Sequence, residues 1–121
     1  MKTTILWLSR HNMTNTQLDD LKRIYGDIQI IDCDKTVNSY RDVLEAGKDC
    51  DILAVVLPPA MIADLVNPRI NTKPVIRARA NRVATGNKIL NPATGKEENE
   101  YKFEHVCWEQ IKKIDIITQI L

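Results

Sequence analysis

Short runs rich in apolar residues alternate with amphipathic segments through the first half of the chain. The runs cover residues 4–9, 27–32 and 50–57, and apolar runs of this length are typical of strands covered on both faces. The segments after them repeat apolar residues at helical spacing. This alternation predicts a parallel sheet with helices on both faces, and right-handed crossovers make the order 2-1-3 the simplest. We therefore expect one Rossmann-like α/β domain over residues 1–121, built in three layers.

The predicted helices carry local boundary signals. Thr14, with Gln17 three residues later, forms a capping box that predicts a helix start. Gly26 suits the end of that helix. Asn38 is a candidate cap for the second helix, and a proline pair introduces a short third helix over residues 60–66.

The second half of the chain predicts a different kind of structure. Residues 75–84 and 100–108 have the pattern of extended strands, and the polar segment between them, residues 87–99, contains Asn-Pro and Thr-Gly turn signals. We expect a β-hairpin extension over about residues 74–109, with a tip that projects beyond the domain. The direction of its first strand stays open. The apolar tail, residues 111–121, is compatible with a helix, a strand or a self-association surface.

Charge and composition exclude several classes of function. The formal net charge of +1 provides no global attraction to duplex nucleic acid or an anionic membrane, so any anion site must be local. No stretch approaches the roughly 20 apolar residues of a membrane helix, and residues 1–8 lack a signal-peptide cleavage site. Cys33, Cys50 and Cys107 are widely spaced and form no Cys-x-x-Cys pair. We interpret the chain as cytoplasmic, with reduced thiols, no metal and no cofactor.

The loop after the first strand is the principal candidate site. Ligands of open parallel sheets bind beyond the carboxyl ends of the strands, where the strand order reverses, here between strands one and three. This loop leads into a helix N-terminus, which favours an anion. Arg10 offers a bidentate contact to phosphate, and His11 offers acid or base catalysis near neutral pH. The other candidate ligand-binding residues of this loop, its helix and the loop after strand three are Ser9, Asn12, Thr14 and Pro58.

Two further arginines are candidate ligand-binding residues in the predicted hairpin. Arg77 and Arg79 are two positions apart, so they share one face of the strand. They either bind phosphates or form salt bridges across the sheet or a dimer interface, and both interpretations stay open. The acidic residues available for such salt bridges are Glu100, Glu104 and Glu109.

Some common motifs are missing, and one has a partial counterpart. The glycines form no Gly-x-Gly-x-x-Gly, which argues against a nicotinamide or flavin dehydrogenase, and a P-loop is missing as well. His105 lies alone in a predicted strand, where a structural role is expected. Residues 8–14 resemble the Leu-x-Arg-His-Gly-x-Thr start of histidine phosphatases, but Asn12 replaces the glycine and the chain is much shorter than that family needs.

The same loop also resembles another family. The chain is similar to small Rossmann-like proteins associated with CRISPR systems, some of which are ring nucleases that bind or cut cyclic oligoadenylates. The similarity covers about the first half of the chain and includes residues 55–60 as the third strand and its turn. The residues that carry it in the first strand and helix are Leu6-Trp7-Leu8-Ser9-Arg10-His11, Met13-Thr14 and Gln17-Leu18-Asp19-Asp20-Leu21.

This resemblance implies a homodimer with one ligand site on the twofold axis. Arg10 and His11 of both subunits would surround the cyclic ligand, and a ribose 2′-hydroxyl would attack its neighbouring phosphate without a metal. His11 is then the candidate base, and Arg10, Ser9 and the helix amides are the candidate donors. The leading hypothesis is a protein that binds, and in its stronger form cleaves, a cyclic oligonucleotide messenger. The alternatives are a non-catalytic sponge that uses the same pocket and an oligomeric protein-interaction module.

Overall fold

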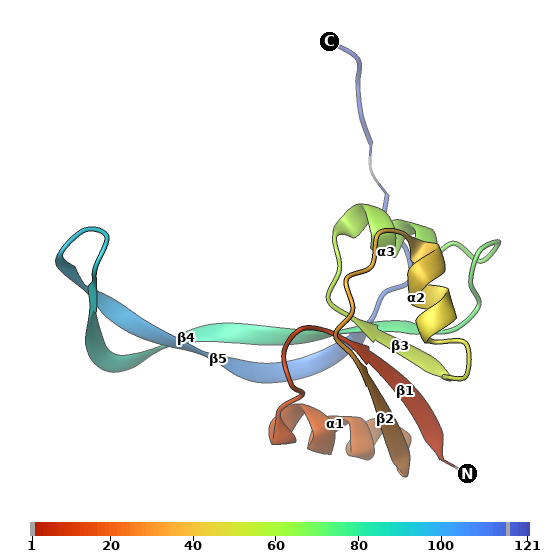
Figure 1. The fold of residues 1–121 in the computed structure, drawn as a ribbon, viewed down its shortest axis with the longest axis horizontal. Coiled ribbons are helices and arrows are strands. Elements are labelled where there is room, and N and C mark those ends of the chain that lie inside the picture. Colours follow the sequence, from red (N-terminus) through yellow and green to blue (C-terminus); the bar gives the residue numbers. More distant parts are fainter. Residues whose placement is uncertain (1, 116) are drawn as a thin grey trace.

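The computed structural model describes residues 2–115 and 117–121, which form an α/β fold around a five-stranded sheet (Figure 1). The sheet order is β2-β1-β3-β4-β5, and the predicted parallel order 2-1-3 is confirmed. The direction of β4, open from the sequence, is parallel to β3, and β5 returns antiparallel to β4. The elements in chain order are β1 (Thr3–Leu8), α1 (Asn15–Tyr25), β2 (Ile28–Cys33), α2 (Tyr40–Ala46), β3 (Ile52–Val55), α3 (Pro59–Leu65), β4 (Val75–Asn91) and β5 (Lys96–Gln110).

Helices cover both faces of the sheet, with α1 on one side and α2 and α3 on the other (Figure 1). Alternate residues of β1 explain this layering: Ile5 and Trp7 pack in the cluster that includes Leu21 of α1. Leu6 and Leu8 pack with residues of α2 and α3. All four β1 side chains are nearly inaccessible to solvent, and each stabilises the fold by about 1.5–3 kcal/mol relative to an exposed position.

The predicted start and end of α1 are both confirmed. The Gln17 amide donates to Thr14 Oγ1 at 3.2 Å, and the Thr14 amide donates to Gln17 Oε1 at 2.9 Å. Gly26 ends the helix with a φ of 80°, a left-handed conformation that is strained for other residues.

The predicted cap of α2 is wrong by one residue. Ser39 occupies the N-cap position, and the Asn38 amide instead donates to the Asp42 carboxylate at 2.9 Å. Both residues are polar and suited to caps, so composition alone did not separate them. The third helix begins at Pro59, so a proline occupies its first turn as expected.

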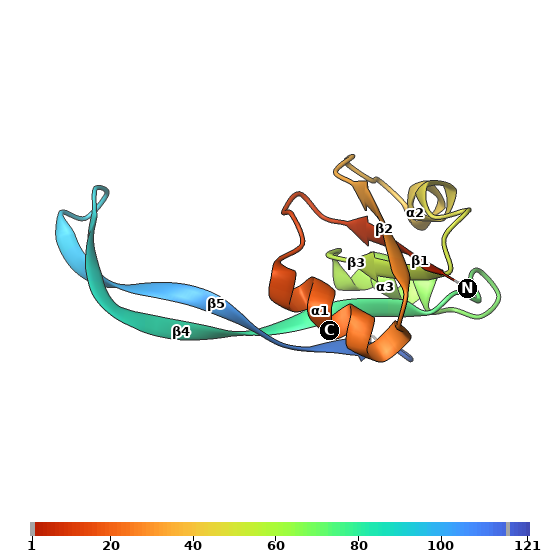
Figure 2. The same cartoon turned by 90° about the horizontal axis from the view of Figure 1, so that it is seen from below.

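The two strands of the hairpin are longer than predicted. Its strands continue through most of residues 87–99, which the sequence assigns to a polar turn, and only residues 92–95 connect them. We define the arm as residues 81–104. None of its residues is buried, and it projects away from the domain (Figures 1 and 2). Alternation of apolar and polar residues marks a strand that is buried on one face. Because both faces of these strands are exposed, their sequence lacks this alternation and resembles that of a loop.

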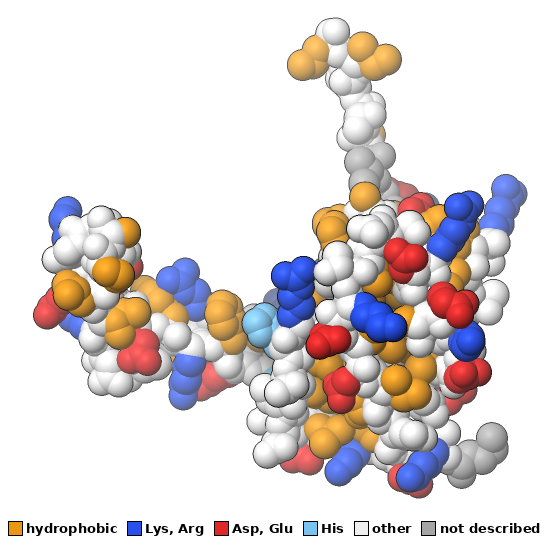
Figure 3. Space-filling model, viewed as in Figure 1, with side chains coloured by type: hydrophobic (Ala, Val, Ile, Leu, Met, Phe, Trp, Pro, Cys, Tyr) orange, Lys and Arg blue, Asp and Glu red, His pale blue; other side chains and the backbone are white. Residues whose placement is uncertain are grey.

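The described residues of the tail, 111–115 and 117–121, form neither helix nor strand, and Ile116 lies outside the described residues. Ile111 and Ile114 pack against the cluster that includes α2 and α3. Ile117, Ile120 and Leu121 are exposed at the end of the chain (Figure 3). Among the described helices, none is long and apolar enough to span a membrane.

Candidate functional site

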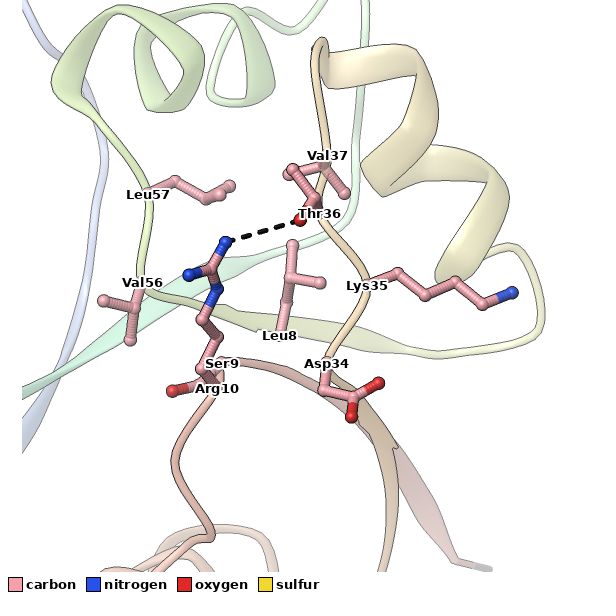
Figure 4. Close-up of a pocket in the computed structure, with 9 residues that line it drawn as sticks. All are labelled: Leu8, Ser9, Arg10, Asp34, Lys35, Thr36, Val37, Val56 and Leu57. Carbon is pink, nitrogen blue, oxygen red and sulfur yellow. Dashed lines mark hydrogen bonds between the residues drawn. The ribbon is translucent and has the colours of Figure 1, made fainter.

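A pocket of about 170 Å³ lies at the carboxyl ends of β1, β2 and β3 (Figure 4). Its lining comes from the last residue of β1, Leu8, and from residues 9–10 after β1, 34–37 after β2 and 56–57 after β3. The site predicted from the sequence lies at this edge but includes only the loops after β1 and β3. It misses the loop after β2, although β2 lies beside β1 and parallel neighbours end at the same edge. The polar run Asp34-Lys35-Thr36 directly after a predicted strand is the signal that identifies it.

Arg10 is one of two cationic residues that line this pocket, and Lys35 is the other. Its guanidinium points into the pocket, and Nη2 donates to Thr36 Oγ1 at 3.4 Å (Figure 4). Among the described residues, no carboxylate forms an ion pair with Arg10. The side chains of Asp34 and Lys35 both extend away from the Arg10 guanidinium (Figure 4). The guanidinium is therefore exposed, loosely held and able to form a stronger charge-assisted contact with an anion.

The rest of the loop after β1 is held by its backbone. The Trp7 indole donates from Nε1 to the His11 carbonyl at 2.8 Å, and the His11 amide donates to Ser9 Oγ at 3.1 Å. Ser9 and Arg10 line the pocket, whereas His11 and Asn12 do not and are exposed. The structure thus brings two of the predicted loop residues together and leaves the imidazole of His11 outside the pocket.

The other predicted ligand-binding residues lie away from this pocket. Thr14 uses its hydroxyl to cap α1, and Pro58 is the N-cap residue of α3, next to the pocket residue Leu57. Arg77 and Arg79 lie on β4, where both contact Glu109: Arg77 Nε at 3.1 Å and Arg79 Nη1 at 3.5 Å. The salt-bridge interpretation of these two arginines is therefore confirmed.

Two side chains of β5, His105 and Trp108, form hydrogen bonds to α1. We call these contacts the clasp. The His105 side chain is 5% exposed, and its Nε2 lies 2.9 Å from Asp20 Oδ2. Hydrogen bonds from His105 and, to a lesser degree, Arg23 hold the pKa of Asp20 below its ordinary value. Trp108 donates from Nε1 to the Gln17 carbonyl at 3.0 Å. The structural role expected for His105 fits this position, because these bonds fix the root of the hairpin to α1.

The thiols and acidic groups assemble no further centre in the part of the chain that is described. Cys33, Cys50 and Cys107 are free, and burial raises the pKa of the Cys50 thiol, which lowers its reactivity. Within residues 2–115 and 117–121, no cluster of three His, Cys, Asp or Glu side chains has a geometry that could hold a metal ion.

Comparisons with known protein families, with curated proteins and with solved structures found no match for this chain.

Proposed function

We propose that this chain binds a phosphate-bearing ligand of the cyclic oligonucleotide class, with Arg10 contacting a phosphate in the strand-end pocket. The observation that carries the proposal is the Arg10 guanidinium, which points into this pocket without a carboxylate partner among the described residues. Thr36 and Ser9 add hydroxyl groups beside it. The parallel order β2-β1-β3 supports the proposal, since a Rossmann-like domain binds nucleotides at this edge.

The size of the pocket defines how such a ligand would bind. A volume of about 170 Å³ is below the roughly 300–1,000 Å³ of sites that enclose a small molecule. The pocket therefore suits one phosphate group, and the rest of the ligand lies outside it. A ligand bound in this way leaves most of its surface free for a second subunit, which supports the homodimeric arrangement implied by the ring-nuclease resemblance.

Cleavage is the stronger form of the proposal. A general base must come within hydrogen-bond reach of the 2′-hydroxyl that it activates. His11 is exposed and follows Arg10 directly in the chain, so its ring suits a ligand that extends beyond the pocket. A non-catalytic sponge needs the same phosphate contact but no base. The effect of His11→Ala on product formation therefore distinguishes the enzyme from the sponge.

A second candidate function is a protein-interaction module, which the exposed arm favours. Ile89, Leu90 and Phe103 are 53%, 64% and 76% exposed, and apolar side chains gather along the arm (Figure 3). A two-stranded hairpin is marginally stable alone in water, and its unpaired edges are templates for pairing with another chain. The arm is thus a suitable surface for a second copy of this chain.

A panel of cyclic oligonucleotides, including cyclic tetra-adenylate, tests these proposals by thermal shift, binding titration and chromatography of the recovered ligand. Loss of one charge-assisted contact in Arg10→Ala should weaken binding roughly 10- to 150-fold. Arg69→Ala is the matched control, because Arg69 is exposed and does not line the pocket. Binding that is unaffected by Arg10→Ala, or no binding to the wild type, contradicts the proposed site.

Product analysis then separates the three functions. Linear products that disappear in His11→Ala support the enzyme, and intact ligand recovered after tight binding supports the sponge. A wild-type protein that binds no nucleotide but self-associates in sedimentation supports the interaction module.

A further inference from the structure

A second and larger cavity lies where the arm leaves the domain. It has a volume of about 560 Å³ and lies between the first turn of α1 and the root of the arm, within the range of sites that hold small organic ligands. Thr16 and Gln17 line it from α1, and Phe103 and His105 line it from β5. Figures 1 and 2 both show the start of α1 beside the hairpin at this point. We call this cavity the arm groove.

The arm groove has one exposed aromatic ring, that of Phe103. Phe103 is 76% exposed although it lines the groove, and Tyr101 and His105 lie two residues to either side on the same face of β5. The Arg82 guanidinium stacks over the Tyr101 ring, 3.8 Å from its centroid. Aromatic faces beside an arginine on a strand are the surface on which single-stranded nucleic acids stack their bases, since every base has a π-face.

One lining residue of the groove, His105, has a polar atom without a partner in the described part of the chain. His105 Nε2 is engaged by Asp20, but His105 Nδ1 is buried and has no hydrogen-bond partner among the described residues. Lys102 and Glu104 at the groove form an ion pair at 3.2 Å. The groove thus combines the exposed ring of Phe103 with polar and charged side chains, a set of groups that suits a planar heterocycle.

One loop connects the two cavities. Arg10 lines the strand-end pocket and Thr14 lines the arm groove. These residues are four positions apart in the chain, and an extended chain of this length spans at most roughly 14 Å. One short oligonucleotide can therefore reach both cavities.

We propose that the arm groove binds a nucleobase of an oligonucleotide whose phosphate contacts Arg10, with Phe103 as the stacking surface. This inference rests on the proposed function, and it adds a specificity determinant that the strand-end pocket lacks. A bound base covers the exposed Phe103 ring and places heteroatoms near His105.

The test compares three probes by binding titration: cyclic tetra-adenylate, linear tetra-adenylate and an abasic ribose-phosphate strand of the same length. Phe103→Ala should weaken the binding of both adenylates roughly 5- to 150-fold, the range for loss of one stacked base. The affinity for the abasic strand should not change. Phe103→Trp should retain the affinity for adenylate. Leu90→Ala is the control, because Leu90 is similarly exposed on the arm but lies far from the groove.

The outcomes distinguish this inference from the proposed function. Adenylate binding that depends on Arg10 but is unchanged by Phe103→Ala overturns the groove as a base site and leaves the strand-end pocket standing. A wild-type protein that binds neither adenylates nor the abasic strand overturns both. If Phe103→Ala alters only the oligomeric state measured by sedimentation, the base site is overturned, and Phe103 instead contacts a second copy of the chain.

Discussion

Trp108 is expected to hold the hairpin against the domain. Its ring meets the Trp7 ring edge to face, with centroids 5.8 Å apart and planes at 81°. It packs against the cluster that contains Leu21 and Ile76, and its Nε1 donates to the Gln17 carbonyl of α1. Trp108→Ala removes the ring and the hydrogen bond together, and it leaves a cavity between the sheet and α1.

These contacts set the expected loss of unfolding free energy in Trp108→Ala. Truncation of a buried tryptophan costs about 3–5 kcal/mol. Trp108 is only partly buried, so we expect about 3 kcal/mol, of which the hydrogen bond contributes about 1 kcal/mol. Since a domain of this size is stable by about 5–15 kcal/mol, the variant should remain folded with a clearly lower stability. Trp108→Phe keeps most of the ring and should lose about 1–1.5 kcal/mol.

Urea unfolding followed by circular dichroism measures these free energies, and hydrogen exchange locates the change. Amides of β5 and α1 should lose protection in Trp108→Ala. Val106→Ala is the control, because Val106 is on the same strand but 48% exposed, and it should change the stability by at most about 0.5 kcal/mol. A loss below about 1 kcal/mol for Trp108→Ala would refute the reasoning, since a ring that contributes to the core cannot be removed at so low a cost.

Two further predictions concern α1. Thr14→Ala removes the capping box and should lower the unfolding free energy by about 1 kcal/mol, whereas Thr16→Ala in the same turn should have little effect; equal losses in urea unfolding would contradict the cap. The pKa of Asp20 is lowered from 3.8 chiefly by the hydrogen bond from His105, so the stability that Asp20 contributes is present above about pH 3.8 and is lost as the pH falls through the folded-state pKa. The difference in unfolding free energy between wild type and Asp20→Asn should therefore be smaller at about pH 3 than at about pH 6, and a difference independent of pH would contradict this assignment.

Local signals made the first half of the fold predictable. The Thr14–Gln17 capping box and the stop at Gly26 act within a few residues, and both are present as expected. The order 2-1-3 followed from the handedness of crossovers, which applies to any parallel sheet. The predicted loop after β1 also lies at the strand-end pocket, because the position of a loop depends on topology.

Side-chain placement within that loop was less predictable. Arg10 points into the pocket, whereas the next residue, His11, does not line it, and its backbone carbonyl accepts a hydrogen bond from the Trp7 indole. That bond depends on where the sheet positions Trp7. The residue types of the loop predict which chemical groups it carries, but they do not predict where each side chain points.

By itself, the sequence determined the first three strands, the helices and the order 2-1-3, since apolar periodicity, caps and crossover handedness are properties of short segments. Tertiary structure decided the length of the arm, the contribution of residues 34–37 to the strand-end pocket and the clasp between His105 and Asp20. The clasp joins residues 85 positions apart, and the arm lacks a regular apolar alternation because its strands are exposed on both faces. Contacts between distant segments leave no periodic signal along the chain, and only the folded arrangement brings them together.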